Sequence, residues 1–144
     1  MIDRRGMLIV GGTMAAAGLG SGSGASTDHP DLGLFKAIYL VKRRSDFSFE
    51  AFVRYQEQTH IPLAHALPGL RRYRLDYFPP MPDGTEQPFD AMASLWFDDK
   101  AAHDAALGSE PGQAALGDLP NFLQTDELVA LFGHTGNVRD DFPT

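Results

Sequence analysis

Three segments predicted to form strands carry apolar side chains on both of their faces. Neighbouring residues of a strand point to opposite sides, and the segments 34–42, 89–97 and 127–132 each alternate between two apolar sets. The sets are Phe35, Ala37, Tyr39 and Val41 against Ile38 and Leu40; Ala91, Ala93, Leu95 and Phe97 against Met92 and Trp96; and Leu128, Ala130 and Phe132 against Val129 and Leu131. A sheet built from these strands has two faces to bury.

The first half of the chain predicts a strand over 34–42, then a helix and a second strand. Ser48 is a suitable helix N-cap and is followed by residues that repeat on one helical face. Pro62 has no amide hydrogen, so we expect the helix to break or kink around His60. The dipeptide Pro68-Gly69 predicts a turn before a strand over 70–78.

The second half predicts a strand, a short helix and a last strand. After a loop over 79–84 and the strand 89–97, Asp98 or Asp99 is the expected N-cap of a helix that extends to Leu107. We expect the next segment to be irregular or only partly helical, because it contains Pro111, Gly112, Gly117 and Pro120. The order βαββαβ is typical of a ferredoxin-like α+β fold with a four-stranded antiparallel sheet.

Two helices cover one face of such a sheet, so the second apolar face needs another partner. We expect a homodimer in which the two sheets pack face to face, with small ligands bound between sheet and helices. The alternative is that loops and the C-terminal tail cover the second face.

Residues 1–25 have the layout of an export signal. Arg4 and Arg5 precede a modestly apolar run over 7–19 and a stretch of small residues. The run is too short and too rich in glycine and alanine for a stable membrane span. The spacing of the arginines before Met7-Leu8 resembles a twin-arginine signal, and a leader of the general secretion route is the alternative.

We therefore expect export to the periplasm. The segment 26–33 is the expected linker, 34–133 the folded domain and 134–144 a polar tail.

The composition restricts the partners and the chemistry. The chain of 144 residues has no cysteine and a formal net charge of −7, which excludes disulfides and thiolate chemistry and gives no positive surface for nucleic acid. His60 and His65 are five residues apart across a proline, without a metal-ligand pattern, and the glycines over 18–24 do not complete GxGxxG. We expect neither a metal nor a tightly bound cofactor.

The stretch from Phe52 to Tyr73 resembles the EthD family. It contains Phe52 and Tyr55, His60-Ile61-Pro62-Leu63-Ala64 and Leu67-Pro68-Gly69-Leu70-Arg71-Arg72-Tyr73. The resemblance implies a dimeric α/β-barrel, whose relatives include lactone isomerases, polyketide cyclases and dehydratases, and cofactor-free oxygenases. The position of Gln56 often carries an aromatic residue in the family, so an amide replaces part of an aromatic pocket wall here.

His60 is the first candidate for catalysis. It stays in phase with Phe49 and Phe52, which places it on the sheet side of the helix, and an imidazole transfers protons near neutral pH. The resemblance points to the same residue, because related isomerases and dehydratases use a pocket histidine. The alternative is a structural role in which the ring caps a carbonyl freed by Pro62.

Several aromatic and polar residues complete the predicted site. Tyr39 and Tyr73 are candidates for polarising a substrate oxygen, and the candidates for binding the substrate are Gln56, Tyr77 and Trp96. Core packing is the alternative for the tyrosines and for Trp96. We expect His65 and His103 at the surface, and we expect a charge-protected edge strand from Arg71, Arg72 and Arg74.

The sequence favours an enzyme that isomerises, dehydrates or oxidises a small, mostly apolar cyclic or aromatic carbonyl compound without a bound cofactor. One alternative is a non-catalytic accessory protein that binds an apolar metabolite in the same cavity. The other is a dimer whose cavity has lost its function.

Overall fold

The computed structural model describes residues 29–141. Within this range, Gly33–Thr135 form one compact unit, and the described residues 29–32 and 136–141 belong to a second unit. The expected export signal over 1–25 lies outside the described residues. No helix in the described part of the chain is long and apolar enough to cross a membrane.

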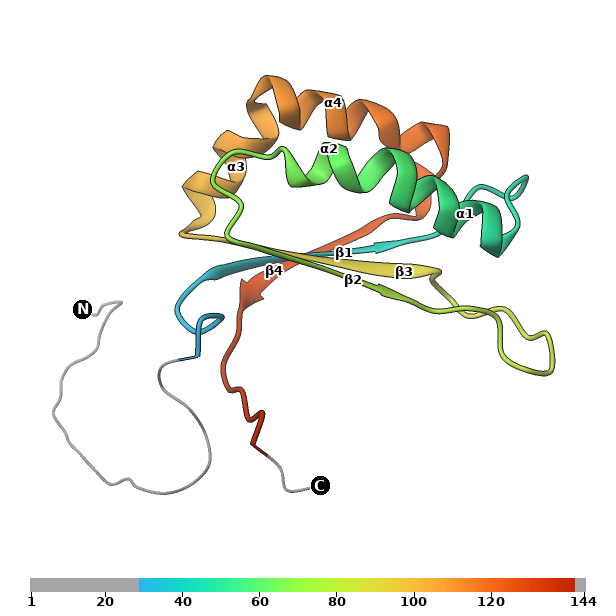
Figure 1. Ribbon diagram of the computed structural model, residues 1–144, viewed down its shortest axis with the longest axis horizontal. Coiled ribbons are helices and arrows are strands. Elements are labelled where there is room, and N and C mark those ends of the chain that lie inside the picture. The colour runs from blue at the N-terminus through green and yellow to red at the C-terminus, as the bar shows by residue number, and fades with distance from the viewer. Residues whose placement is uncertain (1–28, 142–144) are drawn as a thin grey trace, which may run out of the picture. The chain divides into compact units, whose positions relative to one another are not determined.

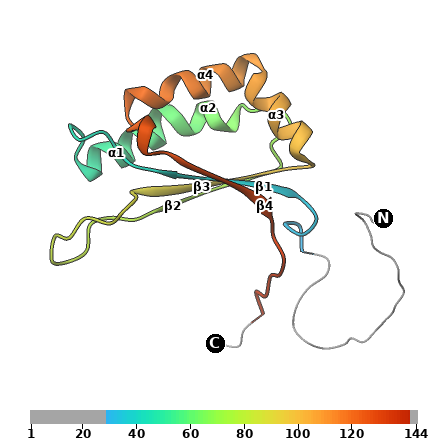
Figure 2. The ribbon, with the colours of Figure 1, turned by 180° about the vertical axis from the view of Figure 1, so that it is seen from behind.

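The main unit is a four-stranded antiparallel sheet with helices on one face (Figure 1). Its strands are β1 (Phe35–Val41), β2 (Arg72–Tyr77), β3 (Ala91–Phe97) and β4 (Val129–His134), in the order β2-β3-β1-β4. The helices α1 (Phe49–Tyr55), α2 (Ile61–His65), α3 (Lys100–Gly108) and α4 (Glu110–Asp118) lie on the same side of the sheet in both views (Figure 2). The ferredoxin-like α+β fold is confirmed, and β2 is an edge strand as expected.

The break or kink that we expected around His60 takes the form of a π-helical turn, and the chain stays helical through it. Ser48 caps α1 by accepting a hydrogen bond from the Ala51 amide at 3.1 Å. After α1 the chain widens into a π-helical turn over Gln56–His60, in which the Ile61 amide donates to the carbonyl of Gln56, and α2 follows directly. Pro62 then lies in the first turn of α2, where a missing amide hydrogen costs little.

The segment after α3 is a full helix, which corrects the expectation of irregular structure. Ser109 caps α4 by accepting from the Gly112 amide at 3.2 Å, and Pro111 lies in the first turn, where proline is tolerated. Gly112 is buried, and a Cβ placed on it would lie 2.1 Å from the carbonyl oxygen of Ala106. The residues that predicted a helix break therefore begin a helix and let it approach α3 closely.

The core lies between the sheet and the helices. One cluster is centred on Phe52 and Phe122, and a second on Leu95 and Phe97. The opposite face of the sheet is mostly apolar on β1, β3 and β4, although it includes Lys36 and Ser94. On β2 it presents the charged residues Arg72, Arg74 and Asp76. On β4, Leu131 is 51% exposed.

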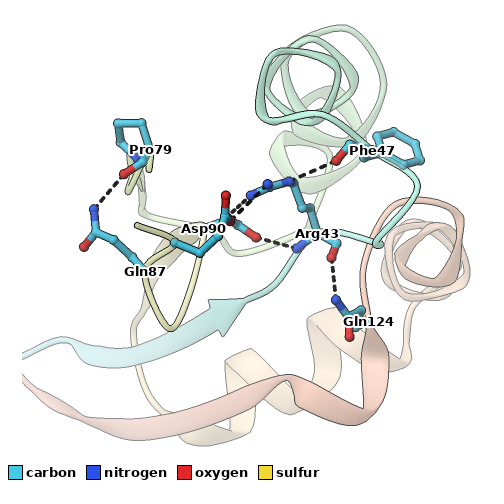
Figure 3. A network of polar contacts seen from close by, with 7 residues as sticks. Arg43, Phe47, Pro79, Gln87, Asp90 and Gln124 are labelled. Atoms are coloured by element: carbon cyan, nitrogen blue, oxygen red, sulfur yellow. Dashed lines mark hydrogen bonds and ion pairs between the residues drawn. The ribbon is translucent and has the colours of Figure 1, made fainter. Parts of the chain in front are cut away.

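A buried ion pair joins β1 to the loop before β3 (Figure 3). The Asp90 carboxylate accepts from the Arg43 guanidinium through one oxygen and from the Arg43 amide, at 2.8 Å, through the other. Arg43 Nε also donates to the carbonyl of Phe47, and Gln124 Nε2 donates to the carbonyl of Arg43. This network fixes the backbone between the end of β1 and the start of α1.

Candidate functional site

A cavity of about 170 Å³ lies between the helices and the sheet. Its walls are almost entirely aliphatic or aromatic. They come from β1, β2, β3, the π-helical turn, α2, α3, α4 and the segment 119–128. The polar side chains in its lining are Tyr39, Gln56, His60 and Tyr73. Four of the six residues predicted for the site therefore line one cavity, and they come from segments far apart in the sequence.

His60, at the end of the π-helical turn, is held by a carboxylate at the end of α4. Its Nδ1 lies 2.9 Å from Oδ2 of Asp118, the last residue of α4. Both side chains are largely buried, with 12% and 8% of their surfaces exposed. An ionised carboxylate only accepts, so Nδ1 carries the proton and Nε2 keeps its lone pair. No hydrogen bond joins Nε2 to a described residue, so this nitrogen is available to a ligand.

The electrostatic surroundings keep the imidazole neutral and the carboxylate charged. Burial lowers the pKa of His60, although the hydrogen bond and the charge of Asp118 oppose this effect. Burial by itself raises the pKa of Asp118, but hydrogen bonds from Tyr55, Asn121 and His60 outweigh it and lower that pKa. A neutral imidazole oriented by a carboxylate is suited to accept a proton.

Gln56 presents a buried acceptor that lacks a partner. The residue is 3% exposed and lines the cavity, and its Oε1 has no hydrogen-bond partner among the described residues. A buried carbonyl left without a donor costs free energy unless a ligand or water supplies one. The Gln56 amide is therefore a polar group in an otherwise apolar wall.

Tyr39 and Tyr73 line the cavity from the sheet side. Both pKa values are raised mainly by burial, that of Tyr39 to about 12. Each side chain therefore remains a neutral phenol at physiological pH and can donate a hydrogen bond to an oxygen. The Tyr39 hydroxyl is already engaged, 2.7 Å from Nε2 of His103.

Trp96 and Tyr77, which we predicted to bind the substrate, do not line this cavity. Trp96 lies on the opposite face of the sheet, where Lys36 Nζ is 4.7 Å from its ring centre. Tyr77 lies on the helix side but packs against Phe49 and Phe52. The alternation of β2 predicted the face of Tyr77 correctly, but not its position along that face.

His103 is buried, which corrects our expectation of a surface position. It is 3% exposed, and its ring contacts the rings of Phe35, Phe97 and Phe132. The alanine-rich sequence of α3 shows no strong apolar side, so the direction of His103 was not evident. His65 is exposed, as expected.

Asp118 is the site residue that the sequence analysis missed. It lies 58 positions after His60, in a segment that we expected to be irregular. Its position just before Leu119 and Pro120, where a helix would end, was the only available signal, and nothing in the sequence pairs it with His60.

The EthD domain family matches residues 44–126, and the chain belongs to this family. An uncharacterized 11.0 kDa protein from the thcB-thcC intergenic region of Rhodococcus erythropolis is 32% identical over 88 residues, which cover 56% of this chain and 84% of that protein.

Solved structures share the fold. An EthD family protein from Bacillus halodurans has a TM-score of 0.60 and 26% identity, and the match covers 71% of this chain and 98% of that one. A dimeric ferredoxin-like protein of unknown function from Bacteroides fragilis has a TM-score of 0.54 and 15% identity, and the match covers 72% of this chain and 97% of that one. The cofactor-independent oxygenase SnoaB of Streptomyces nogalater has a TM-score of 0.53 and 13% identity, and the match covers 74% of this chain and 96% of that one. The last two comparisons concern the fold alone.

Proposed function

We propose that this EthD-family chain is an enzyme that moves a proton on a small, mostly apolar cyclic or aromatic carbonyl compound, with His60 as the base. The observation that carries the proposal is the Asp118–His60 pair: His60 lines an apolar cavity, and its Nε2 has no hydrogen-bond partner among the described residues. Isomerisation, dehydration, cyclisation and cofactor-free oxidation can all begin with removal of a proton, so this step is common to the reaction classes of such enzymes.

The step uses only side chains of the cavity. His60 Nε2 takes a proton from the carbon next to the carbonyl, the electron pair of the C–H bond moves toward the carbonyl oxygen, and an enolate forms. The Tyr73 hydroxyl donates a hydrogen bond to that oxygen. The carboxylate of Asp118 stabilises the imidazolium produced, and His60 returns the proton to a different atom of the intermediate.

The lining also limits the ligand. A cavity of about 170 Å³ with almost wholly apolar walls favours an uncharged ring compound with one or two oxygen atoms. Gln56 Oε1 and His60 Nε2 are both acceptors. Because His60 Nε2 takes part in proton transfer, a hydroxyl group on the ligand would donate a hydrogen bond to Gln56 Oε1.

Deuterium incorporation tests the proton-transfer step without the natural substrate. We expect the protein in D2O to accelerate exchange at the carbon next to the carbonyl of 1-tetralone, followed by NMR. His60→Gln should lower this rate by about 10²-fold or more, whereas His65→Gln, an exposed histidine on the same segment, should not change it. Equal rates for His60→Gln and the unaltered protein would remove His60 from the chemistry.

Native mass spectrometry of the processed protein tests the alternative of binding without turnover. A co-purified molecule that is released unchanged after prolonged incubation would favour an accessory binding protein. We further propose that the processed protein is a homodimer that reaches the periplasm by the twin-arginine route. Replacing Arg4 and Arg5 together by lysine should leave the unprocessed precursor in the cytoplasm if that route is used.

A further inference from the structure

A second histidine reaches the cavity through Tyr39. The hydroxyl of Tyr39, on the helix side of β1, lies 2.7 Å from Nε2 of His103 on α3. The remainder of the His103 ring is enclosed by phenyl rings, the nearest of which have centres 5.4 and 5.5 Å away. Phenyl rings offer the two imidazole nitrogens no conventional hydrogen-bond partner, and the Tyr39 hydroxyl is the partner of Nε2.

The other nitrogen of His103 leads to the protein surface. Its Nδ1 lies 2.9 Å from Oδ1 of Asp104, whose other oxygen accepts from Lys100 Nζ at 2.6 Å. The Asp104 side chain is 53% exposed, and its hydrogen bonds with Lys100 and His103 lower its pKa, so it is ionised at neutral pH. An ionised carboxylate accepts the Nδ1 proton, which leaves Nε2 to accept the proton of the Tyr39 hydroxyl.

We propose that Asp104, His103 and Tyr39 form a proton relay between solvent and the cavity, in which His103 is a positioning residue that acts through Tyr39. In the step, a ligand O–H bond breaks as its proton moves to the Tyr39 oxygen, while the proton of Tyr39 moves to His103 Nε2. The ligand oxygen becomes an anion, the imidazole becomes an imidazolium beside Asp104, and Tyr39 is a phenol before and after. The reverse movement returns a proton to a ligand oxygen.

The relay complements the base at His60 and rests on the proposed function. His60 lies in the helical layer and Tyr39 in the sheet, so they line the cavity from opposite layers. A reaction that removes one proton from carbon and another from a hydroxyl oxygen needs two such acceptors. The relay thus narrows the substrate class to compounds that carry both an enolisable carbon and a hydroxyl group.

A kinetic comparison on 2-hydroxy-1-tetralone, which carries both an enolisable carbon and a hydroxyl group, distinguishes transfer from packing. In His103→Gln, the amide can still accept from Tyr39 but cannot take its proton, so we expect kcat to fall by about 10²-fold with KM unchanged. Tyr39→Phe should cause a similar loss, and the double variant should lose no more than either single variant. A wild-type kcat for His103→Gln with a reduced rate for His60→Gln would overturn the relay and leave the proposed function intact.

His103 is buried, so His103→Gln can fail to fold. Asp104→Asn tests the relay at an exposed side chain instead. We expect kcat to fall about tenfold, since the charge that stabilises the imidazolium is lost. Asp46→Asn, at an exposed aspartate paired with Arg44, is the matched control and should not change kcat. Equal kcat values for the two aspartate variants would count against the relay.

A spectroscopic test holds even if 2-hydroxy-1-tetralone is not turned over. Nitrogen NMR of the histidine rings should show His103 with its proton on Nδ1 and with Nε2 unprotonated. Addition of 4-ethylphenol should shift the His103 Nε2 resonance in the unaltered protein and not in Tyr39→Phe. A proton on Nε2, or a resonance that does not respond to the phenol, would overturn the relay whatever the activity.

Discussion

Asp118 determines which proton-transfer role is open to His60. The carboxylate fixes the Nδ1–H tautomer and points Nε2 away from itself, at a contact of 2.9 Å. Without it, a buried imidazole could exchange its two tautomers and turn its donor nitrogen to the cavity. The direction of the pKa shift of His60 follows from the competition between burial, which lowers it, and Asp118, which raises it.

This competition predicts the pH dependence of proton transfer. Protonated His60 has no lone pair at Nε2, so the exchange rate of 1-tetralone should rise with pH as His60 loses its proton. The midpoint should lie below the ordinary histidine value of about 6.5, because the pKa of His60 is lowered. The other titratable groups in the lining, Tyr39 and Tyr73, have raised pKa values and stay neutral through this range.

Asp118→Asn should move the midpoint to still lower pH, since the charge that raises the pKa of His60 is lost. The plateau rate should also fall, because the tautomer is no longer fixed. The measurement is the exchange rate between pH 4 and 8 for both proteins. A midpoint that moves to higher pH in the variant would contradict this account of the site.

Asp90 is the residue whose loss should most weaken the polar part of the fold. Its carboxylate is 5% exposed and accepts from both the guanidinium and the amide of Arg43. Asp90→Ala should lower the free energy of unfolding by about 3–5 kcal/mol, because a largely buried guanidinium loses its buried partner. Urea unfolding measures the change. Arg44→Ala, which breaks the exposed pair with Asp46, should change it by less than about 1 kcal/mol.

At the level of elements, α4 carries Asp118 to His60, and its approach to α3 depends on one glycine. A side chain at Gly112 would meet backbone oxygen, which cannot move without displacing α3. Gly112→Ala should therefore lower the free energy of unfolding by about 2 kcal/mol or more. Gly117 lies in the same helix with open space around its Cβ position, so Gly117→Ala should raise it by about 0.5–1 kcal/mol. Thermal unfolding of both variants checks the contrast, and equal effects would contradict it.

The elements that the sequence predicted are those defined by local patterns. Alternation located the four strands and their faces, and side-chain capping located the starts of α1 at Ser48 and α3 at Asp99. The irregularity predicted around His60 is a π-helical turn, and α4 was missed because Pro111 lies in its first turn and Gly112 lets it pack closely against α3. The family resemblance led to His60, but the pairings of His60 with Asp118 and of Tyr39 with His103 join residues 58 and 64 positions apart. Such contacts arise only when the layers assemble.

At the level of the whole molecule, one face of the sheet carries no helix from residues 29–141. On this face, β4 presents Val129 and Leu131 beside Ile38 and Leu40 of β1. Val129 and Leu131 are 36% and 51% exposed. Large neighbouring apolar side chains on one surface indicate an interface, and the Bacteroides fragilis protein with this fold is dimeric. The charged side chains of β2 on the same face would lie at one margin of such an interface.

A face-to-face dimer predicts a large effect of charge at Leu131. In a twofold interface every substitution occurs twice, so Leu131→Lys would place two ammonium groups in an apolar contact. We expect the unaltered protein to sediment as a dimer at micromolar concentration and Leu131→Lys as a monomer. Met81→Lys is the matched control, since Met81 is 50% exposed in the loop after β2, and it should remain a dimer. A monomeric unaltered protein, or a dimer that tolerates Leu131→Lys, would show that this face is not the subunit interface.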